Sequence, residues 1–313
     1  MRSVFIINPA AGKKDPTERL SEKIRDYFSE NGDDYKICVT QSAGHATQLA
    51  KQAAQEAGDE PVLIVACGGD GTLREVMCGA IGFDNVFLSV YPCGSGNDYV
   101  KVFPGNGCFT DIAGIINGTV KNVDVIKVGD TYAANICSVG LDADVAYYQK
   151  GYKKYPLISG KMSYNMAVIK SLLRRIGTPL KITIDDEYEM EGAYLFALAG
   201  NGRVYGGGYH GAPKAEVDDG LLDFVFVDKV SHFQVPFLIG KYKSGEHEKI
   251  SRVLKTVRGK KMTIKMDKAR PVNIDGELIF CDEICFEIVP DAVKFLVPMQ
   301  VAVEETPQLI MNH

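Results

Sequence analysis

Residues 62–75 read VLIVACGGDGTLRE, which is an apolar run, a glycine-rich turn and the start of an amphipathic segment. A strand followed by a glycine-rich turn and a helix is a common phosphate-binding arrangement in α/β sheets. Gly68, Gly69 and Gly71 carry no Cβ atom, so the main chain can approach an oxyanion closely. We therefore predict a phosphate-binding loop here, followed by a helix over Thr72–Ile81.

Asp70 is the unusual residue of this loop, because a carboxylate among phosphate-binding glycines would repel the ligand. A divalent cation between the two removes that conflict, so the loop predicts Mg²⁺ bound together with a nucleotide. Thr72 and Glu75 have the spacing of a capping box at the start of a helix. The alternative interpretation is a tight glycine turn without a chemical role.

Two further loops of small residues follow apolar strands on either side of this segment in the sequence. Val4–Ile7 is followed by NPAAGK at residues 8–13, and Val86–Tyr91 is followed by PCGSGND at residues 92–98. Loops at the carboxyl ends of neighbouring parallel strands converge at one edge of the sheet, where they can form a nucleotide pocket. Neither loop has the spacing of a P-loop or of a dinucleotide fingerprint, so those two enzyme classes are not supported.

The order of the predicted elements changes along the chain. The first 130 residues alternate strands with amphipathic helices, which predicts a mainly parallel α/β sheet. From about Val123 onward, β-rich segments follow one another and indicate a second, mostly antiparallel domain. A basic amphipathic helix with apolar residues from Met162 to Ile176 interrupts them. We expect this apolar stripe to pack in the core, with docking on a membrane surface as the alternative.

Composition and charge exclude several classes of protein. Hydrophobic residues make up 46% and charged residues 24%, as in globular proteins, and no apolar run is long enough to span a membrane. Scattered cysteines without a secretory signal favour a cytoplasmic protein with reduced thiols. The net charge of −5 argues against a nucleic-acid binder. Residues 145–180 (+7) and 241–270 (+8) are nevertheless basic, which indicates either contact with anionic lipid or solvated charged faces.

Read together, the three loops resemble the catalytic domain of the diacylglycerol kinase, sphingosine kinase and ceramide kinase family. The shared pattern is Asn8-Pro-x-x-Gly12, Gly-Gly-Asp70-Gly-Thr72-x-x-Glu75 and Pro92-x-Gly-Ser-Gly-Asn97-Asp98. Similar motifs continue in the family's order as Asn201-Gly202, Gly206-Gly207-Gly208, Ala212-Pro213, Asp219-Gly220-x-Leu222-Asp223 and Asp275-Gly276-Glu277. The resemblance covers residues 4–298, and the length of the chain is similar to that of the soluble bacterial lipid kinases in this group.

The resemblance implies an α/β plus all-β fold, with an N-terminal NAD kinase/diacylglycerol kinase-like α/β domain followed by a C-terminal β-sandwich domain. Residues 1–127 would bind ATP, and residues 128–298 would bind the lipid substrate. The tail 299–313 is a candidate segment for packing against the first domain. The implied activity is that of an ATP- and Mg²⁺-dependent lipid kinase. Conversion of diacylglycerol to phosphatidic acid, in phospholipid metabolism, is the leading reaction.

The family's motifs imply roles for individual residues of this sequence. ATP contacts would come from Asn8, Pro9, Ala10, Ala11, Gly12, Thr40, Gly68, Gly69, Asp70, Gly71, Thr72, Leu73, Arg74, Glu75 and Ser95. The general base would be Asp275, because a carboxylate can accept the proton of the acceptor hydroxyl. A structural Mg²⁺ would be bound by Asp219 and by the main-chain carbonyls of Glu216 and Leu221.

Two of these positions have a second interpretation. Arg74 stands where many members of the family have Asn, and its effect on nucleotide or lipid contacts is left open. Taken locally, Asp275-Gly276 has the composition of a hairpin turn, and a turn at a domain cleft can still present its acid to a substrate.

Two other functions stay open, an NAD kinase-like phosphotransferase and a non-catalytic lipid-binding protein with the same fold. The two flanking loops favour the lipid kinase over the first, and the four acids Asp70, Glu75, Asp219 and Asp275 speak against the second. We expect a lipid alcohol substrate, transient contact of a cytoplasmic protein with the anionic inner membrane surface, and no nucleic-acid partner. The identity of the lipid alcohol and the formation of a homodimer are left open.

Overall fold

The N-terminal half of the molecule is a parallel sheet with helices on both faces. The computed structural model describes residues 1–32, 34–152, 160–172 and 176–299. In this half it contains β1 (Arg2–Ile7), α1 (Thr17–Asn31), β2 (Tyr35–Val39), α2 (His45–Ala57), β3 (Val62–Gly68), α3 (Asp70–Ala80) and β4 (Val86–Pro92). Val4 and Ile6 face α2 and α3, whereas Phe5 and Ile7 face α1. Because both faces are covered, β3 is buried along its whole length.

Helix α3 begins at Asp70, two residues before the predicted start. Gly69 is its N-cap residue, and no side chain caps the helix. The Glu75 carboxylate instead accepts a hydrogen bond of 3.2 Å from the Ala46 N–H, at the start of the neighbouring helix α2. The predicted capping box is therefore wrong, because Glu75 serves a different helix.

Antiparallel strands form the C-terminal half. They are β5 (Thr119–Val128), β6 (Thr131–Ala133), β7 (Ile136–Gly140), β8 (Thr178–Ile184), β9 (Tyr188–Gly200), β10 (Leu222–Asp228), β11 (Leu254–Gly259), β12 (Lys261–Ile274) and β13 (Glu277–Val297). Alternate residues of β10 face two sides: Phe224 and Phe226 enter a core between strands, and Val225 and Val227 pack beneath helix α7 (Val235–Lys243). The short helix α4 (Ile112–Ile116) lies between β4 and β5 along the chain.

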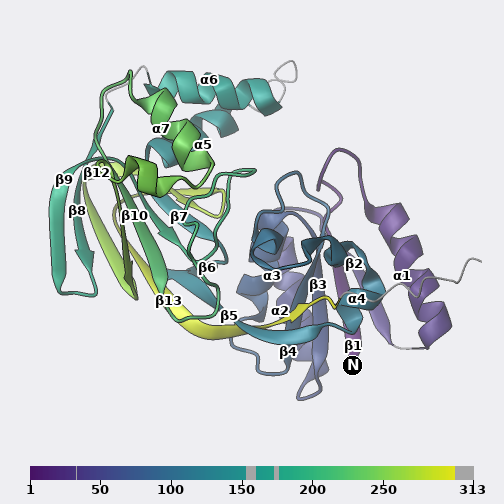
Figure 1. The fold of residues 1–313 in the computed structure, drawn as a ribbon. Coiled ribbons are helices and arrows are strands. Elements are labelled where there is room, and N and C mark those ends of the chain that lie inside the picture. The colour runs from purple at the N-terminus through teal and green to yellow at the C-terminus, as the bar shows by residue number, and fades with distance from the viewer. Residues whose placement is uncertain (33, 153–159, 173–175, 300–313) are drawn as a thin grey trace, which may run out of the picture.

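The last strand joins the two halves, which lie side by side in Figure 1. β13 pairs with β12 at its start, and its last residues pair in parallel with β4, where Phe295 lies opposite Leu88. Ten of the described strands thus follow the order β11-β10-β9-β7-β12-β13-β4-β3-β1-β2, and β5, β6 and β8 pair beside this path. Phe295 is buried in the core of the N-terminal half, where its ring stacks on that of Phe103 with 5.3 Å between the ring centroids. The end of β13 therefore belongs to the N-terminal core, across the predicted boundary between domains.

Three helices lie at one end of the C-terminal half (Figure 1): α5 (Leu141–Tyr152), α6 (Gly160–Leu172) and α7. The sequence predicted α6 but neither α5 nor α7. On α6, Met162, Met166 and Ile169 are 44%, 37% and 59% exposed. The prediction that this stripe packs in the core is therefore wrong for these three residues. Leu173 lies outside the described residues, and Ile176 is buried beyond the end of the helix.

None of the described helices is both long and apolar enough to cross a membrane. All eight cysteines lie in the described part of the chain, and each is free of disulfide bonds.

Candidate active site

A cavity of about 560 Å³ lies at the carboxyl ends of β1, β3 and β4. Its walls come from the three predicted loops, together with the residues after β2 and the start of α2. The loops that are far apart in the sequence therefore converge at one sheet edge, as predicted. The N-terminus of α3 reaches this cavity, and the first N–H groups of a helix have no intrahelical partners. The cavity thus has donors suited to an anion.

Glycines allow the loops to approach each other closely. A Cβ atom on Gly12, which has φ of +81°, would lie 2.5 Å from the Cys93 carbonyl oxygen. A Cβ atom on Gly94 would lie 2.5 Å from the Gly69 Cα atom. Asn8 connects two of the loops, because its Nδ2 donates to Thr72 Oγ1 at 2.9 Å. The loops therefore form one packed cradle.

Most of the residues predicted to contact ATP line this cavity. These are Asn8, Pro9, Ala10, Ala11, Gly12, Thr40, Gly69, Asp70, Gly71, Thr72, Glu75 and Ser95. Gly68 lies behind Thr72, Leu73 is buried in the hydrophobic core, and Arg74 points toward the C-terminal half. The sequence reasoning missed Gln41, Ser42 and Ala43, which line the cavity after β2 and whose only signal was their position after a strand.

A second cavity of about 570 Å³ adjoins the first and shares Asp70, Ser95 and Gly96 with it. Asp98 also lines it, and its other walls come from the C-terminal half: the β12–β13 turn with Asp275, helix α5, and the loop at Tyr205. The two halves of the molecule thus each contribute one cavity, and the shared residues lie between them. Asp275 is brought to the same cavity as Asp70, although 204 residues of sequence lie between them.

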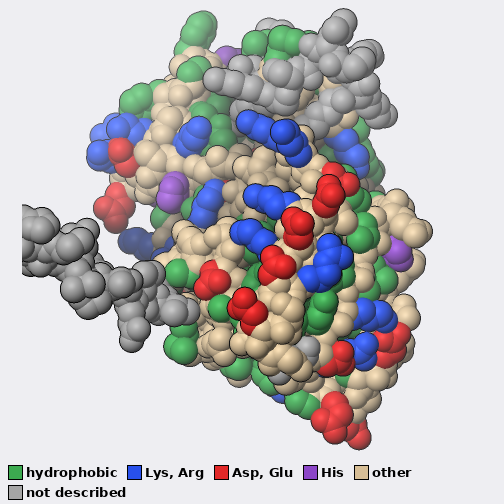
Figure 2. Space-filling model, turned by 90° about the vertical axis from the view of Figure 1, so that its right-hand side faces the viewer, with side chains coloured by type: hydrophobic (Ala, Val, Ile, Leu, Met, Phe, Trp, Pro, Cys, Tyr) green, Lys and Arg blue, Asp and Glu red, His purple; other side chains and the backbone are tan. Residues whose placement is uncertain are grey.

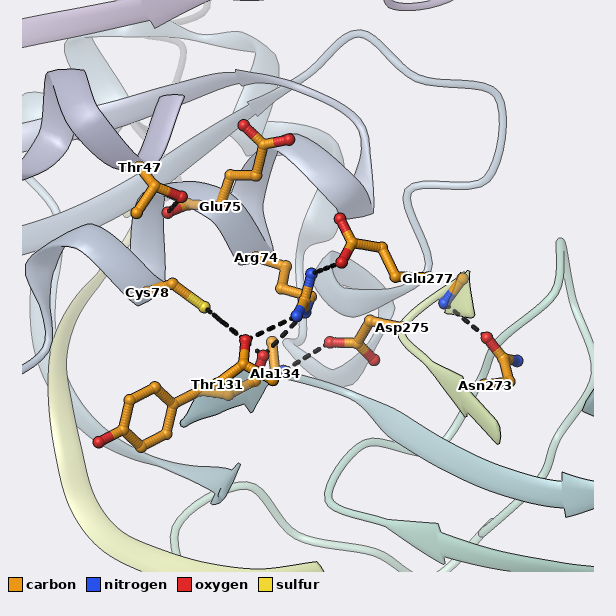
Figure 3. A network of polar contacts seen from close by, with 11 residues as sticks. Thr47, Arg74, Glu75, Cys78, Thr131, Ala134, Asn273, Asp275 and Glu277 are labelled. Atoms are coloured by element: carbon orange, nitrogen blue, oxygen red, sulfur yellow. Dashed lines mark hydrogen bonds and ion pairs between the residues drawn. The ribbon is translucent and has the colours of Figure 1, made fainter. Parts of the chain in front are cut away.

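Asp275 is held by the main chain between β6 and β7. Its carboxylate accepts hydrogen bonds from the N–H groups of Ala134 (2.6 Å), Ile136 (2.8 Å) and Asn135 (3.2 Å), and Figure 3 shows it beside Ala134. Residues 134 and 135, which supply two of these donors, separate β6 from β7. Burial raises the pKa of Asp275 to about 6, although the three N–H groups and Arg74 act in the opposite direction. The predicted hairpin turn is confirmed, with φ of +48° at Asp275 and +89° at Gly276.

Asp70 and Asp98 are the other carboxylates near the boundary of the two cavities. Asp70 Oδ1 accepts a hydrogen bond from the Tyr99 N–H at 3.0 Å, and Asp98 Oδ2 accepts one from the Gly207 N–H at 2.7 Å. Among the described residues no cluster of three or more His, Cys, Asp or Glu side chains could hold a metal. Oxygen ligands from Asp70 and from a bound nucleotide do fit Mg²⁺, which commonly takes few protein ligands.

The carboxylate of Asp219, the predicted side-chain ligand of a second Mg²⁺, is paired with other groups of the protein. One oxygen of its carboxylate accepts a hydrogen bond from the Leu221 N–H at 3.0 Å, and the other is paired with the Arg258 guanidinium. Arg258 also pairs with Asp223 at 2.9 Å, so one guanidinium balances the charge of both acids, and the Mg²⁺ site at Asp219, Glu216 and Leu221 stays a prediction. Glu216 is exposed at the surface.

Asp142 is a residue of the second cavity that the sequence reasoning missed. Its carboxylate accepts hydrogen bonds from Ser138 Oγ, from Tyr205 Oη at 3.1 Å and from Asn273 Nδ2 at 3.3 Å. Burial raises the pKa of Asp142. Its partners come from separate parts of the sequence, so no local motif could have identified it.

Comparison with known families covers nearly the whole chain. The diacylglycerol kinase catalytic domain matches residues 2–128, and the YegS C-terminal NAD kinase beta sandwich-like domain matches residues 135–297. The diacylglycerol kinase of Bacillus subtilis is 27% identical over 279 residues, which are 88% of this chain and 89% of that protein. The predicted order of an α/β domain and a β-sandwich-like domain is thereby confirmed.

Solved structures share this fold at low sequence identity. A diacylglycerol kinase of Bacillus anthracis matches with a TM-score of 0.66 and 23% identity, covering 94% of this chain and 96% of that one. An NAD kinase of Archaeoglobus fulgidus, solved in complex with ATP, matches with a TM-score of 0.50 and 12% identity, covering 95% and 94% of the two chains. These likenesses concern the fold alone.

Proposed function

We propose that this chain, which belongs to the diacylglycerol kinase-like family of lipid kinases, transfers the terminal phosphoryl group of ATP to the hydroxyl group of diacylglycerol. The product would be phosphatidic acid. The observation that carries this proposal is the pair of adjoining cavities, which share Asp70, Ser95 and Gly96 and have Asp275 in the second. A donor and an acceptor bound in the two cavities would meet at the shared residues.

In this proposal residues 1–127 bind the nucleotide and residues 128–298 bind the lipid. The glycine cradle and the N–H groups at the start of α3 would hold the phosphates. Asp70 would hold Mg²⁺ that arrives with the nucleotide, and the ion would supply positive charge to the phosphoryl oxygens. Two features of the cavity support binding of the nucleotide there: the N–H donors at the start of α3 and the volume of about 560 Å³.

Asp275 would accept the proton of the lipid hydroxyl. Because its pKa is about 6, the carboxylate is largely ionised at neutral pH and close to the basicity that suits proton transfer. The two carboxylate oxygens have four lone pairs between them; the N–H groups of Ala134 and Ile136 engage one on each oxygen, and the Asn135 N–H is shared between both oxygens at 3.2 Å. A lone pair is thus left for the acceptor. Transfer also needs little water in the second cavity, since water competes with the lipid hydroxyl.

We expect Gly71→Ala to weaken ATP binding without destabilising the protein. No atom lies within 4 Å of the position that a Cβ would take on Gly71, and this residue lines the nucleotide cavity. The methyl group should therefore enter the space of the phosphates and raise the Kd on the order of tenfold, or about 1.4 kcal/mol. Isothermal titration with Mg·ATP measures the Kd.

Gly240→Ala is the matched control for this variant, because Gly240 lies in helix α7 and its Cβ position is equally free. Both substitutions should raise the melting temperature slightly, since alanine favours a helix over glycine. An unchanged Kd for Gly71→Ala would contradict nucleotide binding in this cavity.

We further propose that the helical end of the C-terminal half contacts an anionic membrane. Large exposed apolar side chains lie on or beside the helices α5, α6 and α7, and we call them the apolar rim: Tyr147, Met162, Met166, Ile169, Phe233, Phe237 and Phe280, whose ring lies 5.3 Å from that of Tyr147. Phe233, just before α7, is 96% exposed. Figure 2, seen from the right-hand side of Figure 1, shows Lys and Arg side chains more often in the upper part of this face, toward the same end. Aromatic and basic side chains together suit an anionic lipid surface.

The two basic segments, residues 145–180 and 241–270, differ in how many of their cations are paired with acids. In residues 241–270 many cations are paired with acids: Lys241 and Lys249 with Glu246, Arg258 with Asp219 and Asp223, Lys261 with Asp186, Lys265 with Glu283, and Arg270 with Asp267. This pairing favours solvated charged faces there. In residues 145–180, Lys170 lies over the Tyr148 ring at 4.4 Å, and Lys150 lines the second cavity. Lys153 and Lys154 lie outside the described residues.

We expect the double substitution Phe233→Ser and Phe237→Ser to reduce binding to vesicles of anionic phospholipid at least tenfold, as measured by co-sedimentation. A phenylalanine side chain contributes about 1.5–3 kcal/mol when it leaves water completely, and partial insertion contributes less. Tyr188→Ser is the matched control, because this exposed aromatic residue starts β9 at the other end of the sandwich (Figure 1). Equal vesicle binding of the double variant and the control would contradict the proposed membrane contact.

An acceptor panel tests the proposed function. Purified protein is given Mg·ATP and, in mixed micelles, diacylglycerol, monoacylglycerol, ceramide or a sphingoid base, with NAD as a soluble acceptor. We expect the highest kcat/KM with diacylglycerol. Phosphorylation of NAD instead would assign the chain to the rival kinase class, and ATP binding without transfer to any acceptor would favour a non-catalytic lipid-binding protein.

A further inference from the structure

Arg74 connects the nucleotide half to the turn that carries Asp275. Its side chain is buried, with 6% of the residue exposed, and its partners all come from the C-terminal side of the sequence (Figure 3). Nε donates to the Tyr132 carbonyl oxygen at 2.8 Å, and Nη2 donates to Thr131 Oγ1 at 2.8 Å. Nη1 forms an ion pair of 2.6 Å with Glu277 Oε2. A guanidinium with donors in a fixed planar fork can fix the relative position of such partners.

The position of Arg74 on helix α3 makes this connection relevant to both cavities. Asp70, in the first turn of α3, lines both of them, and Arg74 follows four residues later on the same side of the helix. Arg74 itself does not line the nucleotide cavity. One helix therefore presents Asp70 to the proposed nucleotide and holds the turn of Asp275 through Arg74.

Besides the hydrogen bonds of Asp275 to residues 134–136, the turn between β12 and β13 is fixed at two further places. At one, Asn273 Oδ1 accepts a hydrogen bond from the Gly276 N–H at 2.8 Å. At the other, Glu277 is held by Arg74, although the Glu277 side chain is 56% exposed and that of Arg74 only 7%. An exposed carboxylate alone would fix nothing, whereas pairing with a buried guanidinium gives the turn a rigid anchor.

We propose that Arg74 is a positioning residue that anchors the Asp275–Glu277 turn to helix α3 and sets the charge environment of the Asp275 carboxylate. Arg74 would thus act through Asp275 and not on the nucleotide. This inference goes beyond the proposed function by assigning a role to a residue that departs from the family's usual Asn, and its kinetic part rests on that function.

The charges around Asp275 predict opposite effects for the two members of the ion pair. Arg74 lowers the pKa of Asp275, so its loss should raise that pKa. Loss of the Glu277 charge leaves the positive charge of Arg74 without its carboxylate partner. That charge should then stabilise the ionised form of Asp275 more strongly and lower the pKa of Asp275. The other charged or titratable groups that line this cavity or are linked to Asp275 electrostatically are Asp70, Asp98, Asp142, Lys150, Tyr205, Tyr99 and Cys137. Both substitutions leave these groups unchanged.

The test measures the titration of Asp275 directly in the full-length protein. Aspartate carboxyl carbons are labelled with carbon-13, and the NMR signal of Asp275 is identified by its absence in Asp275→Asn. We expect Arg74→Gln to raise the pKa of Asp275 above the wild-type value, and Glu277→Gln to lower it by a smaller amount. Arg270→Gln is the matched control. It removes an arginine from β12, the strand that leads to Asp275, and this arginine pairs with Asp267 and not with the turn.

An unchanged pKa in both Arg74→Gln and Glu277→Gln would overturn the proposal. If Arg74→Gln does not fold, Arg74→Lys replaces it, since lysine keeps the charge but loses the planar fork. For Arg74→Lys we expect a nearly normal pKa of Asp275 but a lower kcat at every pH. A kcat equal to that of the wild type would show that no anchoring takes place.

Kinetics separate this inference from the proposed function. If the wild type phosphorylates lipid, the acid limb of its kcat/KM profile should move to higher pH in Arg74→Gln and to lower pH in Glu277→Gln. If no lipid is phosphorylated but the NMR shifts appear, the proposed function fails and the role of Arg74 stands. If lipid is phosphorylated and the acid limb of the kcat/KM profile stays in place in both variants, the proposed role of Arg74 is wrong and the proposed function is retained.

Discussion

Asp275→Asn should lower kcat by about 10²–10⁴-fold and leave the Kd for Mg·ATP unchanged. The substitution removes the carboxylate that would accept the hydroxyl proton, and general-base catalysis contributes a factor of this size. Asp275 lies in the second cavity and not in the nucleotide cavity, so ATP binding should not depend on it. Initial rates of phosphatidic acid formation and isothermal titration with ATP measure the two quantities.

Folding needs a control in this experiment, because an amide at residue 275 would turn its NH₂ group toward one of the N–H donors of Ala134 and Ile136. Asp282→Asn removes a carboxylate from an exposed position on β13 and is the matched variant. A melting temperature close to that of the wild type shows that Asp275→Asn is folded. A folded variant with wild-type kcat would exclude Asp275 as the base.

The pH profile of the wild type follows from the same residue. The pKa of Asp275 is raised to about 6, so the carboxylate is ionised above that pH and protonated below it. The value of kcat/KM should therefore fall about tenfold per pH unit below the pKa, since a single base must be ionised. A rate that does not change through about pH 6 would contradict this role.

Asp70→Asn is the second substitution with a large expected effect. The amide oxygen can still accept the hydrogen bond from the Tyr99 N–H, so the loop should keep its conformation. The charge that would hold Mg²⁺ is lost, and we expect kcat to fall on the order of 10²-fold, with half-maximal activity at a higher Mg²⁺ concentration.

A magnesium titration of the initial rate measures both effects. Asp84→Asn is the matched control, because Asp84 is exposed and precedes β4, at the opposite sheet edge from the cavities. An unchanged magnesium dependence in Asp70→Asn would mean that the ion is held without Asp70.

Local patterns were sufficient to predict the loops that line the first cavity. The strand over residues 62–67, the glycines after it and the two flanking loops depend on neighbouring residues, so their spacing can be read directly. The parallel sheet then brings the loops together because its strands end at one edge. Even here, Glu75 had the spacing of a cap but accepts a hydrogen bond from Ala46.

Long-range contacts explain what the sequence did not reveal. The partners of Arg74 lie 57, 58 and 203 residues away, and those of Asp142 as far as 131 residues away. The pairing of Arg258 with Asp219 also crosses 39 residues. On α6, the 4- and 3-residue spacing identified a helix but could not show whether its apolar side faces a core or the solvent.

Transfer of labelled phosphate from ATP to diacylglycerol tests the central claim most directly. The wild-type chain is incubated with ATP labelled at its terminal phosphate, Mg²⁺ and diacylglycerol in mixed micelles, and the lipid extract is separated. The account predicts labelled phosphatidic acid, formed in equal amount to ADP and only when both diacylglycerol and Mg²⁺ are present. Label that appears in inorganic phosphate or in NAD, with none in the lipid, would contradict it.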